Sequence, residues 1–195
     1  SSPAYMTELG GALANICRIC PDGVLVFFPA YGVMNSTIDH WKTDGTWARI
    51  ERHKFPIVEP RESSRCPAAM DEFYARLDDE SLSGAIFFAV CRGKVSEGLD
   101  FADRRGRAVV ITGIPYPAFM DPKVRLKREY MTERSREGGS VALTGDAWYS
   151  QQATRAVNQA VGRVIRHRLD HGAIIFADSR FAQQQISGGL SKWLR

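Results

Sequence analysis

The sequence has no apolar run long enough to cross a membrane, and its first residues lack the features of a secretory signal. The longest apolar run, 84–91, has the length of a strand, whereas a membrane span needs about 18 apolar residues. No cationic start is followed by an apolar stretch, as a secretory signal requires. We therefore expect no membrane partner. The chain starts at Ser1 without Met and stops at Arg195 without a tail, as a fragment of a longer polypeptide would.

Cysteine is scarce, and the four are Cys17, Cys20, Cys66 and Cys91. So few cysteines in 195 residues make no disulfide framework, and a reducing compartment, cytosolic or nuclear, is the default. Cys17 and Cys20 have the spacing of a metal knuckle, but no second knuckle follows, and an apolar helical stripe favours buried structural thiols. His167 and His171 are four residues apart, but Gly172 indicates that the helix has ended there. We assign no metal ligand.

The sequence also lacks a phosphate-binding loop of the form GxxxxGK[ST]. Its glycine pairs are Gly10-Gly11, Gly138-Gly139 and Gly188-Gly189. None of these pairs opens a phosphate-cradling loop. A domain that contacts nucleotide phosphates without such a loop needs a partner to supply one, and that partner can lie on the same polypeptide.

What is present is the composition of a globular domain. Of the 195 residues, 44% are hydrophobic, 25% are charged and 10% are aromatic, which supports a packed core. The net charge is only +4, but ten basic and five acidic residues between Asp121 and Arg168 give that segment a local surplus of five positive charges. Such a segment is either an anion-binding face or the solvated surface of a charge-laced helix, and charge alone leaves both open.

Short apolar runs alternate with helical patterns along the chain. The expected strands are Val24–Phe28, Phe55–Val58, Ala85–Val90, 108–112 and Ala173–Phe176. The expected helices are 7–20, a stretch with Met34, Ile38 and Trp41 at helical spacing, a helix from about Pro67, and 122–136 and 149–167. Most strands are continuous apolar runs, which is typical of strands covered on both faces. We therefore predict one α/β domain over 1–195, a parallel sheet with helices on both faces.

The predicted helix 149–167 carries the most specific pattern of polar side chains. At 100° per residue, Gln159, Arg163 and Arg166 fall within about 60° of one another, and no acidic residue shares that face. Gly162 costs about 1 kcal/mol of helix propensity, which indicates a close backbone approach. Two forked guanidiniums and an amide on one face suit a polyphosphate. The alternative is a polar face with local contacts only, and we favour the functional interpretation.

Three segments resemble the motifs of a known group of motor proteins. The sequence QAVGRVIRH at 159–167 resembles motif VI of superfamily 2 helicases, in the form of the XPD-like, iron–sulfur-containing group. The sequence RGKVSEGLDF at 92–101 resembles that group's motif V. The segment 24–31, which ends in FFPAY, resembles its motif IV, with Ala30 where serine is expected. The resemblance continues through 58–61, 112–117 and 177–181 and covers about the whole chain.

The resemblance implies the second, C-terminal RecA-like motor domain of an ATP-dependent DNA helicase. In that group the first motor domain, which this chain does not contain, holds motifs I and II, most of the ATP and Mg²⁺ contacts, and a 4Fe–4S cluster. By resemblance, Gln159, Arg163 and Arg166 face the γ-phosphate of ATP, with the arginines as fingers. The resemblance also implies 5′-to-3′ movement, single-stranded and forked DNA as partners, and a nuclear role in DNA repair, recombination and telomere maintenance.

The motif V segment directly follows the strand Ala85–Val90, so we expect it at the carboxyl edge of the sheet, where such folds bind ligands. The residues expected to contact nucleic acid are Gly93, Lys94 and Ser96. The residues expected near the ATP cleft are Glu97, Gly98 and Asp100, whose carboxylates would order water or ribose. One loop would thus touch both DNA and nucleotide and couple the two.

Aromatic and basic residues near other strand ends suit a track for a single strand. These residues are Tyr31, Tyr116 and Arg128, with Phe119 and Arg125 beside them. Stacking and phosphate contacts of this kind bind without sequence preference, although a core or surface role fits each residue alone as well. Trp148 and Tyr149 precede the motif VI helix and are expected to be packing anchors.

Two other functions stay open at this point. One is a module that holds single-stranded DNA or partner proteins without a catalytic duty, against which both arginines and the motif V carboxylates count. The other is a motor that moves on RNA, which the motif residues alone do not exclude.

Overall fold

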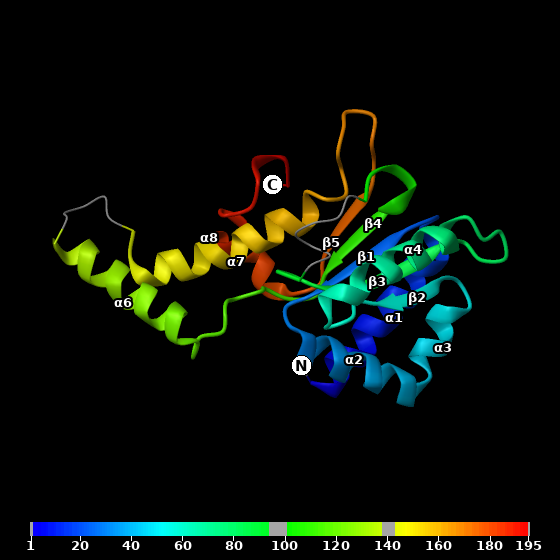
Figure 1. The fold of residues 1–195 in the computed structure, drawn as a ribbon, viewed down its shortest axis with the longest axis horizontal. Coiled ribbons are helices and arrows are strands. Elements are labelled where there is room, and N and C mark those ends of the chain that lie inside the picture. The colour runs from blue at the N-terminus through cyan, green and yellow to red at the C-terminus, as the bar shows by residue number, and fades with distance from the viewer. Residues whose placement is uncertain (1, 94–100, 138–142, 195) are drawn as a thin grey trace.

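The computed structural model describes residues 2–93, 101–137 and 143–194. The elements in chain order (Figure 1) are α1 Pro3–Ile19, β1 Val24–Phe28, α2 Tyr31–Asp44, α3 Thr46–Glu51, β2 Phe55–Val58, η1 Ser63–Arg65, α4 Cys66–Leu77, β3 Ala85–Val90, η2 Asp103–Arg105, β4 Ala108–Ile111, α6 Pro122–Glu137, α7 Gly145–Val161, β5 Ala173–Phe176, η3 Ser179–Ala182, α8 Gln184–Ser187 and η4 Lys192–Leu194. The predicted site residues Lys94, Ser96, Glu97, Gly98 and Asp100 lie outside the described residues.

The described strands form one parallel sheet in the order β2-β3-β1-β4-β5. β1 is central, and its Val24 is aligned with Ile86 of β3 and with Ala108 of β4. Every residue of β1, β3 and β4 is buried, as continuous apolar runs predict for strands covered on both faces. The predicted fold class is thus confirmed, and β4 alone ends one residue before its predicted bound, at Ile111.

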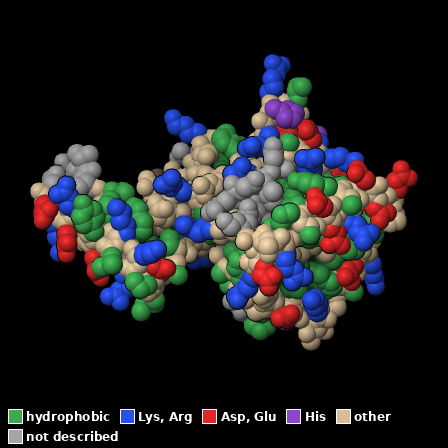
Figure 2. Space-filling model, viewed as in Figure 1, with side chains coloured by type: hydrophobic (Ala, Val, Ile, Leu, Met, Phe, Trp, Pro, Cys, Tyr) green, Lys and Arg blue, Asp and Glu red, His purple; other side chains and the backbone are tan. Residues whose placement is uncertain are grey.

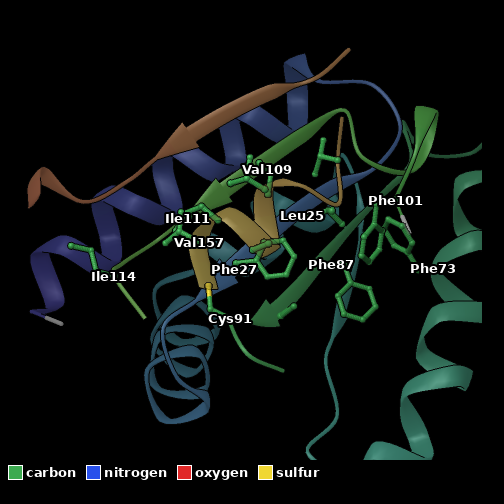
Figure 3. Packing of buried hydrophobic residues seen from close by; sticks show 14 of the residues in the cluster. Leu25, Phe27, Phe73, Phe87, Cys91, Phe101, Val109, Ile111, Ile114 and Val157 are labelled. Carbon is green, nitrogen blue, oxygen red and sulfur yellow. The ribbon is translucent and has the colours of Figure 1, made fainter. Parts of the chain in front are cut away.

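Helices cover both faces of the sheet (Figure 1). Helices α1, α2 and α3 cover one face, where the rings of Trp41 and Phe88 pack 5.9 Å apart. Helices α4 and α7 cover the other face, where Phe73 contacts Phe87 and Phe101 at ring distances of 5.6 and 6.0 Å (Figure 3). Phe101 is the last residue of the motif V segment, so the core fixes the point at which that segment ends.

Helices α6 and α7 form a pair that projects from the sheet (Figure 1). None of the described residues of α6 is buried, and its basic and acidic side chains are interspersed over the projecting part (Figure 2). This part of the basic segment 121–168 therefore has the mixed charge of a solvated helix surface.

Helix α7 begins earlier than the sequence pattern predicts. Thr144 is its N-cap, and the Thr144 hydroxyl accepts a hydrogen bond from the N–H of Ala147 at 3.2 Å, which stabilises a helix start at Gly145. Trp148 and Tyr149 therefore lie within α7, and the prediction that they precede this helix is wrong.

The cysteines are free thiols in this structure. Cys17 is buried on α1, as predicted, whereas Cys20 is half-buried. Burial raises the pKa of Cys17 to about 12 and that of Cys91, directly after β3, to about 12 as well. Among the described helices, none is both long and apolar enough to span a membrane.

Lys54 is a fully buried charged residue at the amino ends of the strands. Its Nζ donates hydrogen bonds to the carbonyl oxygens of Asp22, at 2.7 Å, and Ser83, at 2.6 Å. Burial disfavours the charged form and lowers the pKa of Lys54. The side chain thus ties together the loops that precede β1, β2 and β3.

Replacing Lys54 with Met should lower the free energy of unfolding by about 2–4 kcal/mol, because two carbonyl groups lose their buried donor. Urea denaturation of the wild-type and variant chains measures this difference. Lys123→Met, at an exposed position of α6, is the matched control and should change stability by less than about 0.5 kcal/mol. Equal stabilities of the two variants would contradict the structural role of Lys54.

Candidate functional site

The loops that follow the parallel strands meet at the carboxyl edge of the sheet, where folds of this kind bind ligands. Tyr31 follows β1, Glu59 follows β2, Gly93 follows β3 and Tyr116 follows β4. The guanidinium of Arg61 lies 5.7 Å from the centre of the Tyr31 ring. Three residues predicted to contact nucleic acid, Tyr31, Gly93 and Tyr116, therefore lie at one edge, each after a different strand.

Glu59 is a buried carboxylate among these loops, with 2% of its surface exposed. Its Oε2 accepts a hydrogen bond from the N–H of Val90, the last residue of β3, at 2.7 Å. Its own N–H donates to the carbonyl of Phe88 at 2.8 Å. Burial, the charge of Glu59 and a hydrogen bond to it raise the pKa of Tyr31 to about 12. Glu59 thus connects the loop after β2 to the start of α2 and to the end of β3.

Gly93 fits against Glu59 because it has no side chain. A Cβ at this position would lie 2.5 and 2.7 Å from the two carboxylate oxygens of Glu59, closer than van der Waals contact permits. The N–H of Gly93 donates to the carbonyl of Val90 at 2.8 Å. The structure therefore requires glycine at the start of the motif V segment, for packing against a carboxylate rather than for a positive φ.

Arg92 holds a left-handed backbone conformation, with φ at 69°, which costs a residue other than glycine of order 1 kcal/mol. Its guanidinium donates to the carbonyl of Pro115, at 3.3 Å, and to that of Gln152 in α7, at 2.6 Å. These contacts compensate the backbone strain. They also attach the start of the motif V segment to the helix that carries motif VI.

The other end of the motif V segment contacts motif VI directly. The N–H of Phe101 donates to the carbonyl of Arg163 at 3.2 Å, and the Phe101 ring is buried in the core (Figure 3). The described ends of the segment thus lie at the carboxyl edge, at Gly93, and beside the predicted arginine fingers, at Phe101.

Helix α7 ends before the predicted arginine fingers. Its last residue is Val161, and its C-cap is Gly162. The N–H of Arg163 donates to the carbonyl of Ala160, three residues back, at 3.3 Å, which is the tightened geometry of a helix end. Arg163 and Arg166 therefore lie in the turn after α7, and the prediction that they share one helical face with Gln159 is wrong.

The packing of Val164 explains this early helix end. Val164 is fully buried, and its Cγ1 would lie 3.3 Å from a Cβ at Gly106 and 3.2 Å from one at Gly172. These two glycines precede β4 and β5, so the chain leaves the helix to place Val164 between the two loops. The helical spacing of the apolar residues correctly predicted that Val164 faces the core. That spacing did not distinguish a turn from a continued helix.

The three residues predicted to contact nucleotide still lie within one short segment of the structure. Gln159 is exposed on the last turn of α7, Arg163 is half-buried and Arg166 is exposed. Nη1 of Arg166 donates to the carbonyl of Gly162 at 3.1 Å, and its N–H donates to Oδ2 of Asp170 at 3.2 Å. The carboxylate of Asp170 thus lies against the backbone of Arg166. The predicted helix, by contrast, had no acidic residue on the face of Arg166.

Asp103, His167 and Asp170 each place a potential ligand atom within 4.8 Å of the others. His167 Nε2 and Asp103 Oδ1 are 3.0 Å apart. The group fits a metal ion poorly, because the Asp170 carboxylate already accepts hydrogen bonds from three backbone N–H groups and from Arg107. We assign it to the packing of the turn.

Two predicted track residues belong to an aromatic cluster that joins the loop after β4 to α6 and α7. The rings of Tyr116 and Tyr149 are stacked at 5.2 Å, and the Tyr149 hydroxyl donates to the carbonyl of Pro117 at 2.7 Å. The guanidinium of Arg128 lies 4.3 Å from the Phe119 ring and 5.0 Å from the Tyr149 ring. Arg128 also forms an ion pair with Asp146 of α7. The cluster connects Tyr116 to Arg128 through Tyr149.

Sequence reasoning gave no role to Glu59 or to Asp170. The signal for Glu59 was an acidic residue immediately after an apolar strand and before Pro60. The signal for Asp170 was an acidic residue four positions after Arg166. Neither pattern is specific without the partners that the fold supplies.

Comparison with known proteins gives close relatives. The chain is 55% identical to a regulator of telomere elongation helicase 1 homolog of Oryza sativa subsp. japonica, over 98% of this chain and 20% of the relative. It is 53% identical to the homolog of Arabidopsis thaliana, over 99% of this chain and 20% of the relative. The chain thus spans about a fifth of the length of these relatives. From the sequence we expect a regulator of telomere elongation helicase first and a Fanconi-anaemia J helicase second, the second favoured only by 186–195. These relatives confirm the first expectation.

A solved XPD helicase has the same fold. It superimposes with a TM-score of 0.64 at 22% identity, over 97% of this chain and 30% of the solved chain. The family model described as the helicase C-terminal domain matches residues 13–195. The chain belongs to the helicase C-terminal domain family.

Proposed function

We propose that this chain is the second RecA-like motor domain, over residues 1–195, of an ATP-dependent DNA helicase. The observation that carries the proposal is a hydrogen bond between the two segments expected to bind DNA and nucleotide. The N–H of Phe101, in the motif V segment, donates to the carbonyl of Arg163, in motif VI. Through this hydrogen bond, a movement of the motif V segment would be transmitted to the turn after α7, which holds Arg163 and Arg166. A helicase needs such a connection between its DNA-binding and nucleotide-binding parts.

The nucleotide side of the proposal rests on Gln159, Arg163 and Arg166. The chain has no phosphate-binding loop of its own, so the first motor domain of the full polypeptide would hold ATP and Mg²⁺. Arg163 and Arg166 would approach the γ-phosphate from this domain and stabilise the charge that develops as the phosphoryl group is transferred. Gln159, exposed one turn before them, would hydrogen-bond at the same phosphate or at the attacking water.

The nucleic-acid side rests on the carboxyl edge. Tyr31 and the backbone at Gly93 would contact a single strand there, as would Lys94 and Ser96, which lie outside the described residues. Tyr116 and Arg128, which are connected through the aromatic cluster, would extend the track. Closure of the two motor domains on ATP and their opening after hydrolysis would step the enzyme along the strand.

We also propose finer features of the whole enzyme, which the names of the relatives support. The relatives are named regulators of telomere elongation, which supports a role in telomere maintenance, DNA repair and recombination on single-stranded and forked DNA. We also propose 5′-to-3′ movement, a 4Fe–4S cluster in the first motor domain and a nuclear location. Glu97, Gly98 and Asp100 would contact water or ribose beside the nucleotide.

Alanine at Arg163 or Arg166 should lower the turnover of DNA-stimulated ATP hydrolysis by at least about tenfold in the full-length enzyme, because a charge-assisted contact to the transferred phosphoryl group is lost. Lysine should restore only part of the rate, since a point charge does not reproduce the forked guanidinium. Steady-state ATPase assays with saturating single-stranded DNA measure both effects.

Arg49→Ala, at an exposed position of α3 on the opposite face of the sheet, is the matched control and should keep wild-type turnover. DNA affinity without nucleotide should barely change in any of these variants. Wild-type turnover of both arginine variants would contradict the arginine-finger assignment.

Gly93→Ala should weaken the coupling of DNA binding to ATP hydrolysis, because the new Cβ would collide with the Glu59 carboxylate and displace the start of the motif V segment. We expect the stimulation of ATPase by single-stranded DNA to fall at least about fivefold, with a smaller change in the DNA-free rate. Gly32→Ala is the matched control, because a Cβ there meets nothing within 4 Å. The same stimulation in both variants would argue against coupling through this loop.

A further inference from the structure

Asp170 lies between the turn after α7 and β5, and its carboxylate is fully buried. Its Oδ2 accepts hydrogen bonds from the N–H of Arg166, at 3.2 Å, and from the N–H of Asp103, at 3.3 Å. Its Oδ1 accepts from the N–H of His171, at 2.9 Å, and from Nη1 of Arg107, at 3.0 Å. Four donors therefore converge on one carboxylate.

These donors belong to segments that are far apart in the sequence. Asp103 begins η2, two residues after Phe101, where the motif V segment ends. Arg166 lies in motif VI, in the turn after α7. Arg107 leads into β4, and its Nη1 also donates to the carbonyl of His171 at 2.8 Å. The Asp170 carboxylate thus attaches both functional segments to the sheet at one point.

The apolar packing of this turn comes from Val164, which is fully buried, and from Ile165, which is half-buried against the core. The side chains from Arg166 to Leu169 are exposed, and Leu169 is 78% exposed. Burial alone would raise the pKa of Asp170, but the backbone N–H groups and Arg107 lower it, so the carboxylate is ionised at neutral pH. The place of the Arg166 backbone therefore depends on charge-assisted hydrogen bonds.

We propose that Asp170 is a positioning residue for ATP hydrolysis, one that fixes the backbone of Arg166 relative to the end of the motif V segment at Asp103. The inference rests on the proposed function, because the place of Arg166 matters to turnover only if its guanidinium reaches the nucleotide. Asp170 itself touches no reacting atom. Its effect is geometric, and a displacement of about 1 Å at a catalytic group can cost about 100-fold in rate.

A double-mutant cycle in the full-length enzyme tests the proposal. The proteins are wild type, Asp170→Asn, Arg166→Ala and the double variant. Asparagine keeps the shape of the side chain but replaces one acceptor oxygen with a donor, so two of the four hydrogen bonds lose their acceptor. We expect kcat for DNA-stimulated ATP hydrolysis to fall at least about tenfold in Asp170→Asn, with KM for ATP within about threefold of wild type.

The double variant separates positioning from a general structural role. If Asp170 acts through Arg166, the double variant should have a kcat within about twofold of Arg166→Ala alone. An Asp170→Asn enzyme with wild-type kcat, or a full tenfold further loss in the Arg166→Ala background, would overturn the inference. Wild-type kcat of Arg166→Ala would instead overturn the proposed function of that arginine, and the inference with it.

Two further variants complete the test. Asp44→Asn is the matched control, because Asp44 also accepts a backbone hydrogen bond, from the N–H of Thr46 at 2.9 Å, but is the last residue of α2, on the other face of the sheet. Its kcat should stay within about twofold of wild type. If Asp170→Asn fails to fold, Arg107→Lys keeps the charge and loses the shared contact to Asp170 and His171. That enzyme should lose about three- to tenfold in kcat, and wild-type kcat would overturn the inference.

Discussion

The arrangement of the carboxyl edge depends on the buried carboxylate of Glu59. This one side chain accepts a hydrogen bond from the last residue of β3, holds the tyrosine that begins α2, and leaves room only for glycine at position 93. The loops after β1, β2 and β3 therefore cannot shift independently of one another. Because a buried carboxylate is costly to leave without its donors, the three loops form a unit at the edge where we propose that a single strand binds.

Much of the fold was predictable because local patterns of apolar residues determine where its strands begin and end. β1, β2, β3 and β5 have their predicted bounds, since each is a continuous apolar run. β1 and β3 are buried throughout, as such runs predict for strands covered on both faces, whereas the edge strands β2 and β5 are mostly half-buried. The bounds of α7 were not predictable in the same way. Its start depends on the hydroxyl of Thr144, and its end depends on the packing of Val164 between two loops, so both are set by groups outside the periodic pattern.

The candidate site was predictable only as far as topology decides it. Parallel strands end at one edge, so Tyr31, Gly93 and Tyr116 had to lie there. Their contacts were not predictable, because these join residues distant in the sequence: Glu59 reaches Val90, 31 positions away, and Asp170 reaches the N–H of Asp103, 67 positions away. No spacing rule for a helix or a strand covers such pairs, and the fold alone brings them together.

The burial of the thiols has a chemical consequence. The thiolate is the form that oxidants and alkylating agents attack, and a thiol of pKa about 12, such as Cys91, is ionised in only about one molecule in 10⁵ at pH 7. Cys91 lies next to Arg92 at the carboxyl edge, and burial keeps its thiol in the unreactive protonated form while the domain is folded. Half-buried Cys20, before β1, is the most accessible of the four thiols, so an alkylating agent would reach the folded domain first at the amino edge of the sheet.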